Sequence, residues 1–345
     1  MQRGAVRCAA PLYLESFAQP FFTGFINSMT NEEKTQRYRA LVEECLKTQR
    51  FEEAIAFYRQ LIDLNPGDDS YRLGLAWACY DGGKTDQAIA CFEQVFEKEL
   101  QRSVFTGFAF DELVRIYKES KKYDRLVDVC ERALAAQPED IALLGELGDA
   151  YLKAGRAGDA VGIFEKMTAM EPDASSFFCS LGQARIMNHD FAGGEAAYRQ
   201  AAAIDACETR SVFNRRAQAF LQAGQMEKAE MAFREGLAEY KDDPMLLLRL
   251  GDVLIQQGKI QEGSEAYQRT IEMNRDAAGV YLNRLGHTLA RAHYHREAVG
   301  AFKKAIAHDP QNPFYYMALS ESCRSLGDLE MAAEALRQAQ RINSK

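Results

Sequence analysis

Small and large hydrophobic residues recur along the chain with a period of about 34 residues. Nine copies of this pattern fill residues 35–345, and a four-residue insertion near 101–105 interrupts the spacing once. The copies begin near Thr35, Asp69, Gly107, Ile141, Ser175, Arg210, Pro244, Gly279 and Pro313. A fixed period of this length indicates an array of stacked repeats, in which each repeat packs on its neighbours.

Within one repeat, the hydrophobic spacing predicts two amphipathic helices. Positions 4, 8 and 11 share one face of a first helix, and positions 20, 24 and 27 share one face of a second helix. Position 20 is small in eight repeats, whereas position 24 is mostly large and hydrophobic. The residues at position 24 are Tyr58, Phe92, Cys130, Phe164, Tyr198, Phe233, Tyr267, Phe302 and Leu336. We therefore expect the two helices to approach closely at the small residues.

Glycine marks the turn that the pattern predicts between the two helices. It occupies position 15 in five repeats, as Gly83, Gly155, Gly224, Gly258 and Gly327, and glycine is favoured directly after a helix. The third repeat, residues 107–140, is the least regular, because Leu126 and Cys130 replace the small and aromatic residues expected there. The residues that keep its register are Tyr117, Ala133 and Pro138.

The repeat at residues 141–174 carries the fullest version of the pattern. Its characteristic residues are Leu147, Gly148, Tyr151, Ala160, Phe164 and Pro172. This pattern resembles the tetratricopeptide repeat, which combines L-G-x₂-Y, A-x₃-F and a late proline. The resemblance covers residues 35–345 and implies an all-α fold, a right-handed α-solenoid superhelix of tandem helix-turn-helix hairpins. It also implies a non-enzymatic scaffold or adaptor that binds partner peptides in a concave groove.

The two ends of the chain differ from the repeats between them. Residues 1–34 form an aromatic-rich extension, and Thr30 and Glu33 have the spacing of a capping box before the first helix. Three interpretations of the extension stay open: a segment upstream of the true start, a disordered or capping arm, or an organelle-targeting peptide. At the other end, Gln340 occupies a position that is mostly hydrophobic in earlier repeats, and a polar residue there is typical of a terminal repeat.

Composition narrows the class of protein. The net charge of −8 argues against broad affinity for nucleic acid, because basic patches must neutralise phosphates. No apolar run reaches the roughly 18 residues that a membrane span requires. The eight cysteines include no CxxC pair. Four of them, Cys45, Cys79, Cys130 and Cys323, fall in predicted core positions, which favours buried thiols in a reducing, cytoplasmic setting over disulfides.

The sequence contains no catalytic or metal-binding motif that would predict a different function. The sequence contains no glycine-rich phosphate loop, nucleophile elbow or zinc-protease motif, so we expect neither enzymatic activity nor a cofactor. His287, His293 and His295 lie close together in the sequence. Because His293 and His295 fall in a predicted turn, solvated histidines are favoured over a metal site.

The family resemblance also implies which residues bind partners. In tetratricopeptide repeats, positions 2, 5, 6, 9, 12 and 13 of the first helix line the groove. In repeats 1–4 these positions are acidic, with an aromatic cluster of Trp77, Tyr80 and Phe108. In repeats 6–9 many of them are basic or carry amides, although Asp252 and Glu321 interrupt this pattern. The basic and amide residues are Asn214, Arg215, Gln218, Gln222, Arg249, Gln256, Asn283, Arg284, His287, Arg291 and Arg324.

Arginine occupies position 6 in three successive repeats, as Arg215, Arg249 and Arg284. Stacking of the repeats would align these side chains in a row, and guanidinium groups pair well with carboxylates. Solvating surface charge explains each arginine singly, but it explains the repetition less well. We therefore predict that an acidic peptide segment binds in the groove of repeats 6–9.

Alternatives to this binding mode remain open at the level of sequence. The aromatic cluster is a rival anchor, because buried aromatic residues dominate many binding interfaces. The chain could instead be a subunit or regulator of an enzyme complex, or a cell-envelope assembly adaptor, which would require export. The sequence leaves open the identity of the protein partner and the oligomeric state.

Overall fold

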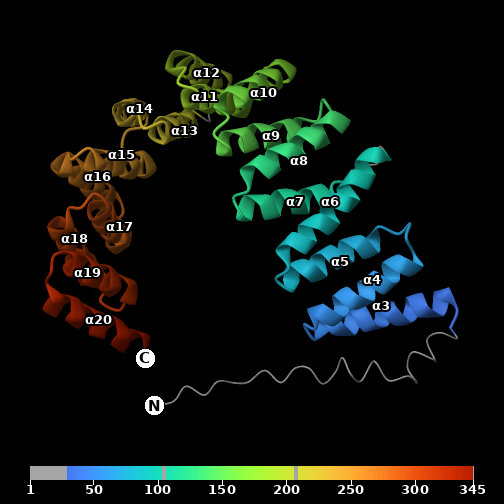
Figure 1. Ribbon diagram of the computed structural model, residues 1–345. Helices are drawn as coiled ribbons and strands as arrows, with labels where there is room; N and C mark the ends of the chain where they lie inside the picture. Colours follow the sequence, from blue (N-terminus) through green and yellow to red (C-terminus); the bar gives the residue numbers. More distant parts are fainter. Residues whose placement is uncertain (1–28, 103–105, 206–208, 345) are drawn as a thin grey trace. The chain divides into compact units, whose positions relative to one another are not determined.

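The computed structural model describes residues 29–102, 106–205 and 209–344. These residues form eighteen α-helices, α3 to α20, which follow one another in consecutive antiparallel pairs (Figure 1). The only other helix among them is the short 3-10 helix η2 (Arg275–Ala277). The predicted all-α fold of tandem helical hairpins is confirmed. Of the predicted N-terminal extension, residues 1–28 lie outside the described residues.

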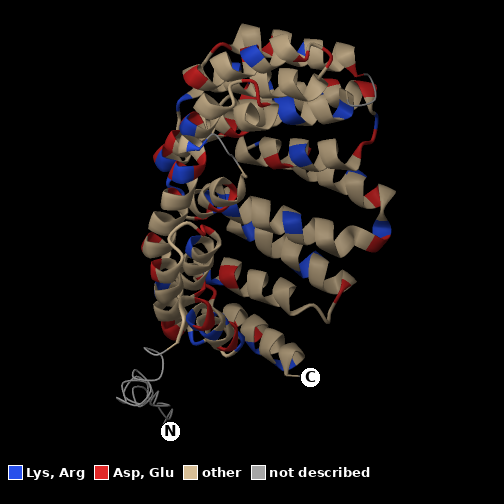
Figure 2. Cartoon of the chain, turned by 90° about the vertical axis from the view of Figure 1, so that its right-hand side faces the viewer, with Lys and Arg blue, Asp and Glu red and all other residues tan. Residues whose placement is uncertain are grey.

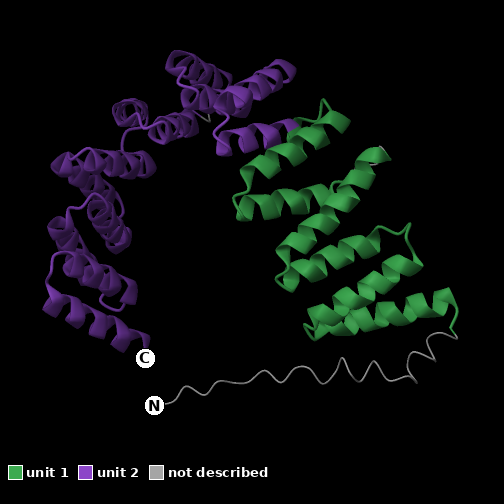
Figure 3. Cartoon of the chain, viewed as in Figure 1, with its two compact units in different colours: residues 1–143 green, residues 144–345 purple. Residues whose placement is uncertain are grey.

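The chain divides into two compact units, residues 1–143 and 144–345 (Figure 3). The helices before the boundary are α3 (Asn31–Lys47), α4 (Phe51–Leu64), α5 (Ser70–Asp81), α6 (Thr85–Gln101), α7 (Phe108–Glu119) and α8 (Tyr123–Ala136). The boundary falls within α9 (Ile141–Lys153).

The helices that follow it are α10 (Ala157–Met170), α11 (Ser175–Met187), α12 (Phe191–Ile204), α13 (Thr209–Gln222), α14 (Met226–Glu239), α15 (Pro244–Gln256), α16 (Ile260–Met273), α17 (Ala278–Arg291), α18 (His295–His308), α19 (Pro313–Ser325) and α20 (Leu329–Asn343). In the second unit, three first helices contact the first helix of the next repeat: α11 contacts α13, α15 contacts α17, and α17 contacts α19.

Every first helix ends in the same backbone motif. The residue at position 15 has a positive φ in all nine repeats, with glycine in five and Gln49, Lys121, His189 and His293 in the other four. The next residue donates its backbone N–H to the carbonyl five residues earlier, with N···O distances of 2.7–3.0 Å. This is the Schellman motif, which satisfies carbonyls left unpaired at a helix end. The predicted turn position is therefore confirmed, and it does not depend on glycine.

Helix starts and lengths agree with the sequence pattern except at the insertion. α3 begins after Thr30, whose hydroxyl accepts a hydrogen bond from Glu33 N at 3.2 Å, while Thr30 N donates to Glu33 Oε2 at 2.8 Å. The predicted capping box is thus confirmed. The insertion lengthens the second helix of repeat 2: α6 has 17 residues, whereas α4 and α8 have 14 each.

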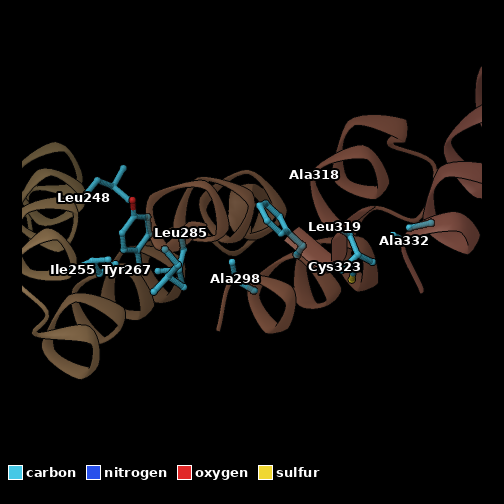
Figure 4. Packing of buried hydrophobic residues seen from close by; sticks show 13 residues of the cluster. Leu248, Ile255, Tyr267, Leu285, Ala298, Ala318, Leu319, Cys323 and Ala332 are labelled. Carbon is cyan, nitrogen blue, oxygen red and sulfur yellow. The ribbon is translucent and has the colours of Figure 1, made fainter. Parts of the chain in front are cut away.

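Small and large residues meet between the two helices of a hairpin, as the sequence predicts. A Cβ atom at Gly286 would lie 2.5 Å from Phe302 Cε1, so no larger residue fits there without movement. Phe302 belongs to a core cluster that extends through repeats 7–9 (Figure 4). In the irregular third repeat, Leu126 and Cys130 are both fully buried, so a large residue at position 20 fills the space that a small residue at position 24 leaves. Its predicted register is confirmed.

The predicted burial of four cysteines is also confirmed. Cys45, Cys79, Cys130 and Cys323 are all buried. Burial raises the pKa of the Cys45, Cys79 and Cys323 thiols, because the thiolate is disfavoured away from water. These cysteines therefore act as small hydrophobic residues of the core.

Candidate protein-binding surfaces

The three arginines at position 6 lie on α13, α15 and α17, and each has a different environment. Arg215 Nη2 donates a weak hydrogen bond to Ser180 Oγ at 3.3 Å. Arg249 is half-buried, and its Nε is buried without a hydrogen-bond partner in the described part of the chain. Arg284 Nη2 instead forms an ion pair with Asp252 Oδ2 at 2.5 Å. The row predicted from sequence thus contains two arginines without an ion pair among the described residues and one that is neutralised.

The Asp252 carboxylate is the centre of a hydrogen-bond network between repeats 7 and 8. Its side chain is only 14% exposed, and it accepts hydrogen bonds from the Tyr267 hydroxyl and from Thr288 Oγ1, the latter at 2.8 Å. Burial and the neighbouring Asp252 carboxylate raise the pKa of Tyr267. The pKa of Arg284 is also raised, because its hydrogen bond and ion pair with Asp252 outweigh the opposing effect of burial. Arg284 therefore helps to hold α15 against α17.

The amide side chains predicted to bind lie near these arginines. Gln218 Nε2 is 3.5 Å from Asn214 Oδ1, one turn away on α13, which is the limit of a hydrogen bond. The Oδ1 atom of Asn283 on α17 is buried and has no partner among the described residues. An unsatisfied buried acceptor costs about 1–3 kcal/mol.

The remaining basic residues of the prediction lie toward the ends of α17 and α19. His287 is exposed, and its ring meets the edge of Phe302 with centroids 5.1 Å apart. Desolvation of its ring lowers the pKa of His287, as does the nearby Arg291 cation, while Glu321 opposes both. Arg291 and Arg324 are exposed. His287 is therefore favoured in its neutral form.

In the first unit, Trp77 and Tyr80 make separate contacts. Trp77 is 42% exposed, and its ring packs edge-on against Phe92 with centroids 6.2 Å apart. Tyr80 lies under the Arg115 guanidinium, 4.5 Å from the ring centroid, and donates to Glu119 Oε2 at 2.7 Å. No ring contact in the described chain joins Trp77, Tyr80 and Phe108 to one another.

A cavity that the sequence prediction did not single out lies among the first helices of repeats 4–6. Its volume is about 450 Å³. The lining residues are Asp149, Leu152, Lys153, Gln183, Met187 and Gln222. Gln183 Nε2 on α11 donates to Gln222 Oε1 on α13 at 3.0 Å. All six residues occupy groove positions 9, 12 or 13, so extending the position pattern through repeat 5 would have found Gln183 and Met187.

Two further features bear on the class of protein. None of the helices described is both long and apolar enough to cross a membrane. His293 lies in the turn after α17 and His295 begins α18, with ring centroids 6.0 Å apart. Across the described ranges, no group of three or more His, Cys, Asp or Glu side chains is placed to hold a metal ion.

Consecutive antiparallel helix pairs, each closed by the same turn, define an α-helical repeat protein. Profiles described as tetratricopeptide repeat match residues 46–105, 117–177, 220–282 and 283–345. These segments make up more than half of the chain, and the chain belongs to the tetratricopeptide repeat family.

Two curated proteins are similar in sequence. The CTR9 homolog of Arabidopsis thaliana is 23% identical over 309 residues, which are 85% of this chain and 27% of that protein. The human protein O-mannosyl-transferase TMTC1 is 23% identical over 160 residues, which are 45% of this chain and 18% of that protein. The chain thus spans only about a quarter or less of the length of these relatives.

Several solved structures are also similar. A MamA structure aligns at 17% identity with a TM-score of 0.37, covering 50% of this chain and 94% of MamA. YrrB, described as a TPR protein with an unusual peptide-binding site, aligns at 18% identity and a TM-score of 0.35, covering 53% and 93%. The APC/C hetero-tetramer Cut9–Hcn1 aligns at 14% identity and a TM-score of 0.37, covering 93% and 56%.

Proposed function

We propose that the chain is a non-enzymatic scaffold that binds segments of other proteins, and that an acidic segment binds the first helices of repeats 6–8. Arg249 carries this proposal. Its guanidinium is half-buried and makes no ion pair with any carboxylate that the structure describes, and its Nε lacks a partner. A carboxylate from a partner would satisfy this group, and Arg215 on α13 supplies a second cation.

The positive charge around Arg249 does not extend over the rest of the described helices. Basic and acidic residues are interspersed over the described helices (Figure 2), so no extended field of one sign would draw in partners indiscriminately. A hydrogen bond to a charged group contributes about 1.5–3 kcal/mol, whereas an exposed ion pair contributes at most about 1 kcal/mol. We therefore expect Arg249 to contribute more to affinity, and the exposed charges around it to affect mainly the association rate.

A peptide-display selection on the full chain would test the proposal. We expect acidic sequences to be enriched, and we expect the double variant Arg215→Glu/Arg249→Glu to weaken their binding at least tenfold. Arg296→Glu is a matched control, because Arg296 is exposed on the second helix α18. Arg284 is unsuitable for this test, since its substitution would disturb the Asp252 network. Enrichment of neutral or basic peptides, or equal binding by the double variant and the control, would refute the proposal.

The scaffold proposal also excludes catalysis by the chain itself. Its support is that each described α-helix belongs to a repeat hairpin, which leaves the described residues without a separate catalytic domain. Substrate turnover by the purified chain, abolished by a substitution on one of its own helices, would overturn this part of the proposal.

A further inference from the structure

Three large hydrophobic side chains stand exposed at the same position of three successive repeats. Met245, Val280 and Phe314 occupy position 2, in the first turns of α15, α17 and α19. Their exposed fractions are 51%, 61% and 70%. Met317, one turn further along α19, is 47% exposed. We call Met245, Val280 and Phe314 the apolar row.

The repeat fold does not require a hydrophobic residue at this position. In five of the other six repeats it is polar or small, as Gln36, Ser70, Ala142, Ser176 and Ser211. The exception is Phe108 on α7, in the other compact unit, which is 63% exposed. Single exposed hydrophobic residues are ordinary on protein surfaces, but three at the same position of consecutive repeats are not scattered. The packing of the described helices therefore leaves the apolar row unexplained.

Basic side chains lie beside the apolar row. Arg249 follows Met245 by four residues, so both lie on one face of α15, about one helical turn apart. On α17, Arg284 has the same relation to Val280, but Asp252 neutralises it. The carboxylate nearest in sequence to the row, Asp243, is buried at the start of α15, where it accepts from Leu246 N and pairs with Arg210. Beside Met245, the uncompensated charge among the described residues is thus that of Arg249.

The spacing between side chains of the apolar row determines which secondary structure of a bound segment can contact all three. Packed helices lie about 8–10 Å apart, so neighbouring side chains of the row are separated by about this distance. Seven residues of an α-helix rise about 10.5 Å and return to nearly the same face. In an extended strand, residues on one face are separated by about 6.6 or 13 Å, neither of which matches. An α-helix with hydrophobic residues seven apart fits the spacing.

We propose that the apolar row binds one amphipathic α-helix of a partner protein, with hydrophobic residues spaced by seven and acidic residues on the side that faces Arg249 and Arg215. The inference rests on the proposed function and specifies the partner's chemistry. Burying Val280 and Phe314 would contribute about 1.5–3 kcal/mol each if burial were complete. The apolar contacts would then supply most of the affinity, and the arginines would select acidic helices.

A display library of helical peptides about three heptads long, presented to the full chain, would test this inference. We expect selected sequences to carry hydrophobic residues at seven-residue spacing and acidic residues on one flank. The variant Val280→Ser/Phe314→Ser should lower the affinity for a selected peptide at least tenfold without lowering the melting temperature. Leu329→Ser is the matched control, since Leu329 is 68% exposed on α20, the second helix of repeat 9.

The outcomes separate this inference from the proposed function. If Arg215→Glu/Arg249→Glu abolishes binding of acidic peptides while Val280→Ser/Phe314→Ser does not, the inference is overturned and the proposed function stands. If neither double variant alters binding, both fail. A second copy of this chain is the rival occupant. A wild-type dimer in sedimentation velocity that Val280→Ser/Phe314→Ser converts to monomer would overturn the inference in favour of self-association.

Discussion

At the scale of single residues, the residue at position 15 of each repeat has the same backbone conformation whatever its side chain. All nine residues there have a positive φ, between 55° and 83°, although only five are glycine. A left-handed conformation costs a residue with a Cβ roughly 1–2 kcal/mol, and glycine adopts it without this penalty. Gln49 and Lys121 are exposed, so burial of their side chains does not offset this cost.

We predict that Gln49→Gly and Lys121→Gly each stabilise the hairpin that contains them by about 0.5–1 kcal/mol. The gain is smaller than the strain because glycine also increases the entropy of the unfolded chain. Chemical denaturation of the full chain would measure the change, and Gly155→Ala, at a φ of 75°, should be destabilising by a similar amount. A loss of stability in either glycine variant would show that the side chain contributes contacts at this turn.

At the scale of the helix, the sequence pattern predicted what depends on one repeat at a time. Helix pairs, turn positions, the small–large packing of Gly286 against Phe302 and the register of the irregular third repeat all follow from spacing within a repeat. Contacts between repeats do not. Arg215, Arg249 and Arg284 are equivalent in sequence, but only Arg284 faces a carboxylate, because Asp252 occupies position 9 of the preceding first helix.

We predict that Asp252→Ala destabilises the chain by about 2–3 kcal/mol. The substitution leaves Arg284 without its ion-pair partner, and it removes an acceptor that Tyr267 and Thr288 share in a mostly buried site. Glu334→Ala is the control, since Glu334 pairs with Arg337 at the surface with both side chains more than half exposed, and such pairs contribute little. Equal stability of the two variants, measured by thermal unfolding, would contradict a structural role for the network.

At the scale of the whole molecule, the candidate binding residues divide between two compact units. Trp77, Tyr80 and Phe108 lie in the first unit, and the arginines of repeats 6–8 and the apolar row lie in the second. The position pattern located most of these residues but could not rank them, since exposure and ion pairing depend on neighbouring helices. The apolar row was within the predicted groove positions, yet its significance depends on exposures that the sequence does not give.

Because the candidate residues lie in two separate compact units, we predict that destabilising one unit leaves binding by the other unit unchanged. In a repeat array each hairpin contacts only its neighbours, so a loss of stability remains local. Leu113 on α7 is fully buried, and Leu113→Ala should destabilise the first unit by about 2–5 kcal/mol. Hydrogen exchange measured by mass spectrometry should show lost protection in repeats 2–4 and unchanged protection in repeats 6–9.

The same variant should bind an acidic helical peptide as the wild type does, because every residue proposed to contact that peptide lies in the second unit. Leu247→Ala on α15 is the matched counterpart, since Leu247 is 1% exposed and belongs to the second unit. We expect it to lower peptide affinity along with the protection of repeats 6–9. If Leu113→Ala weakened binding as much as Leu247→Ala does, the binding surface would have to extend into the first unit, and the aromatic residues around Trp77 would become the stronger candidate.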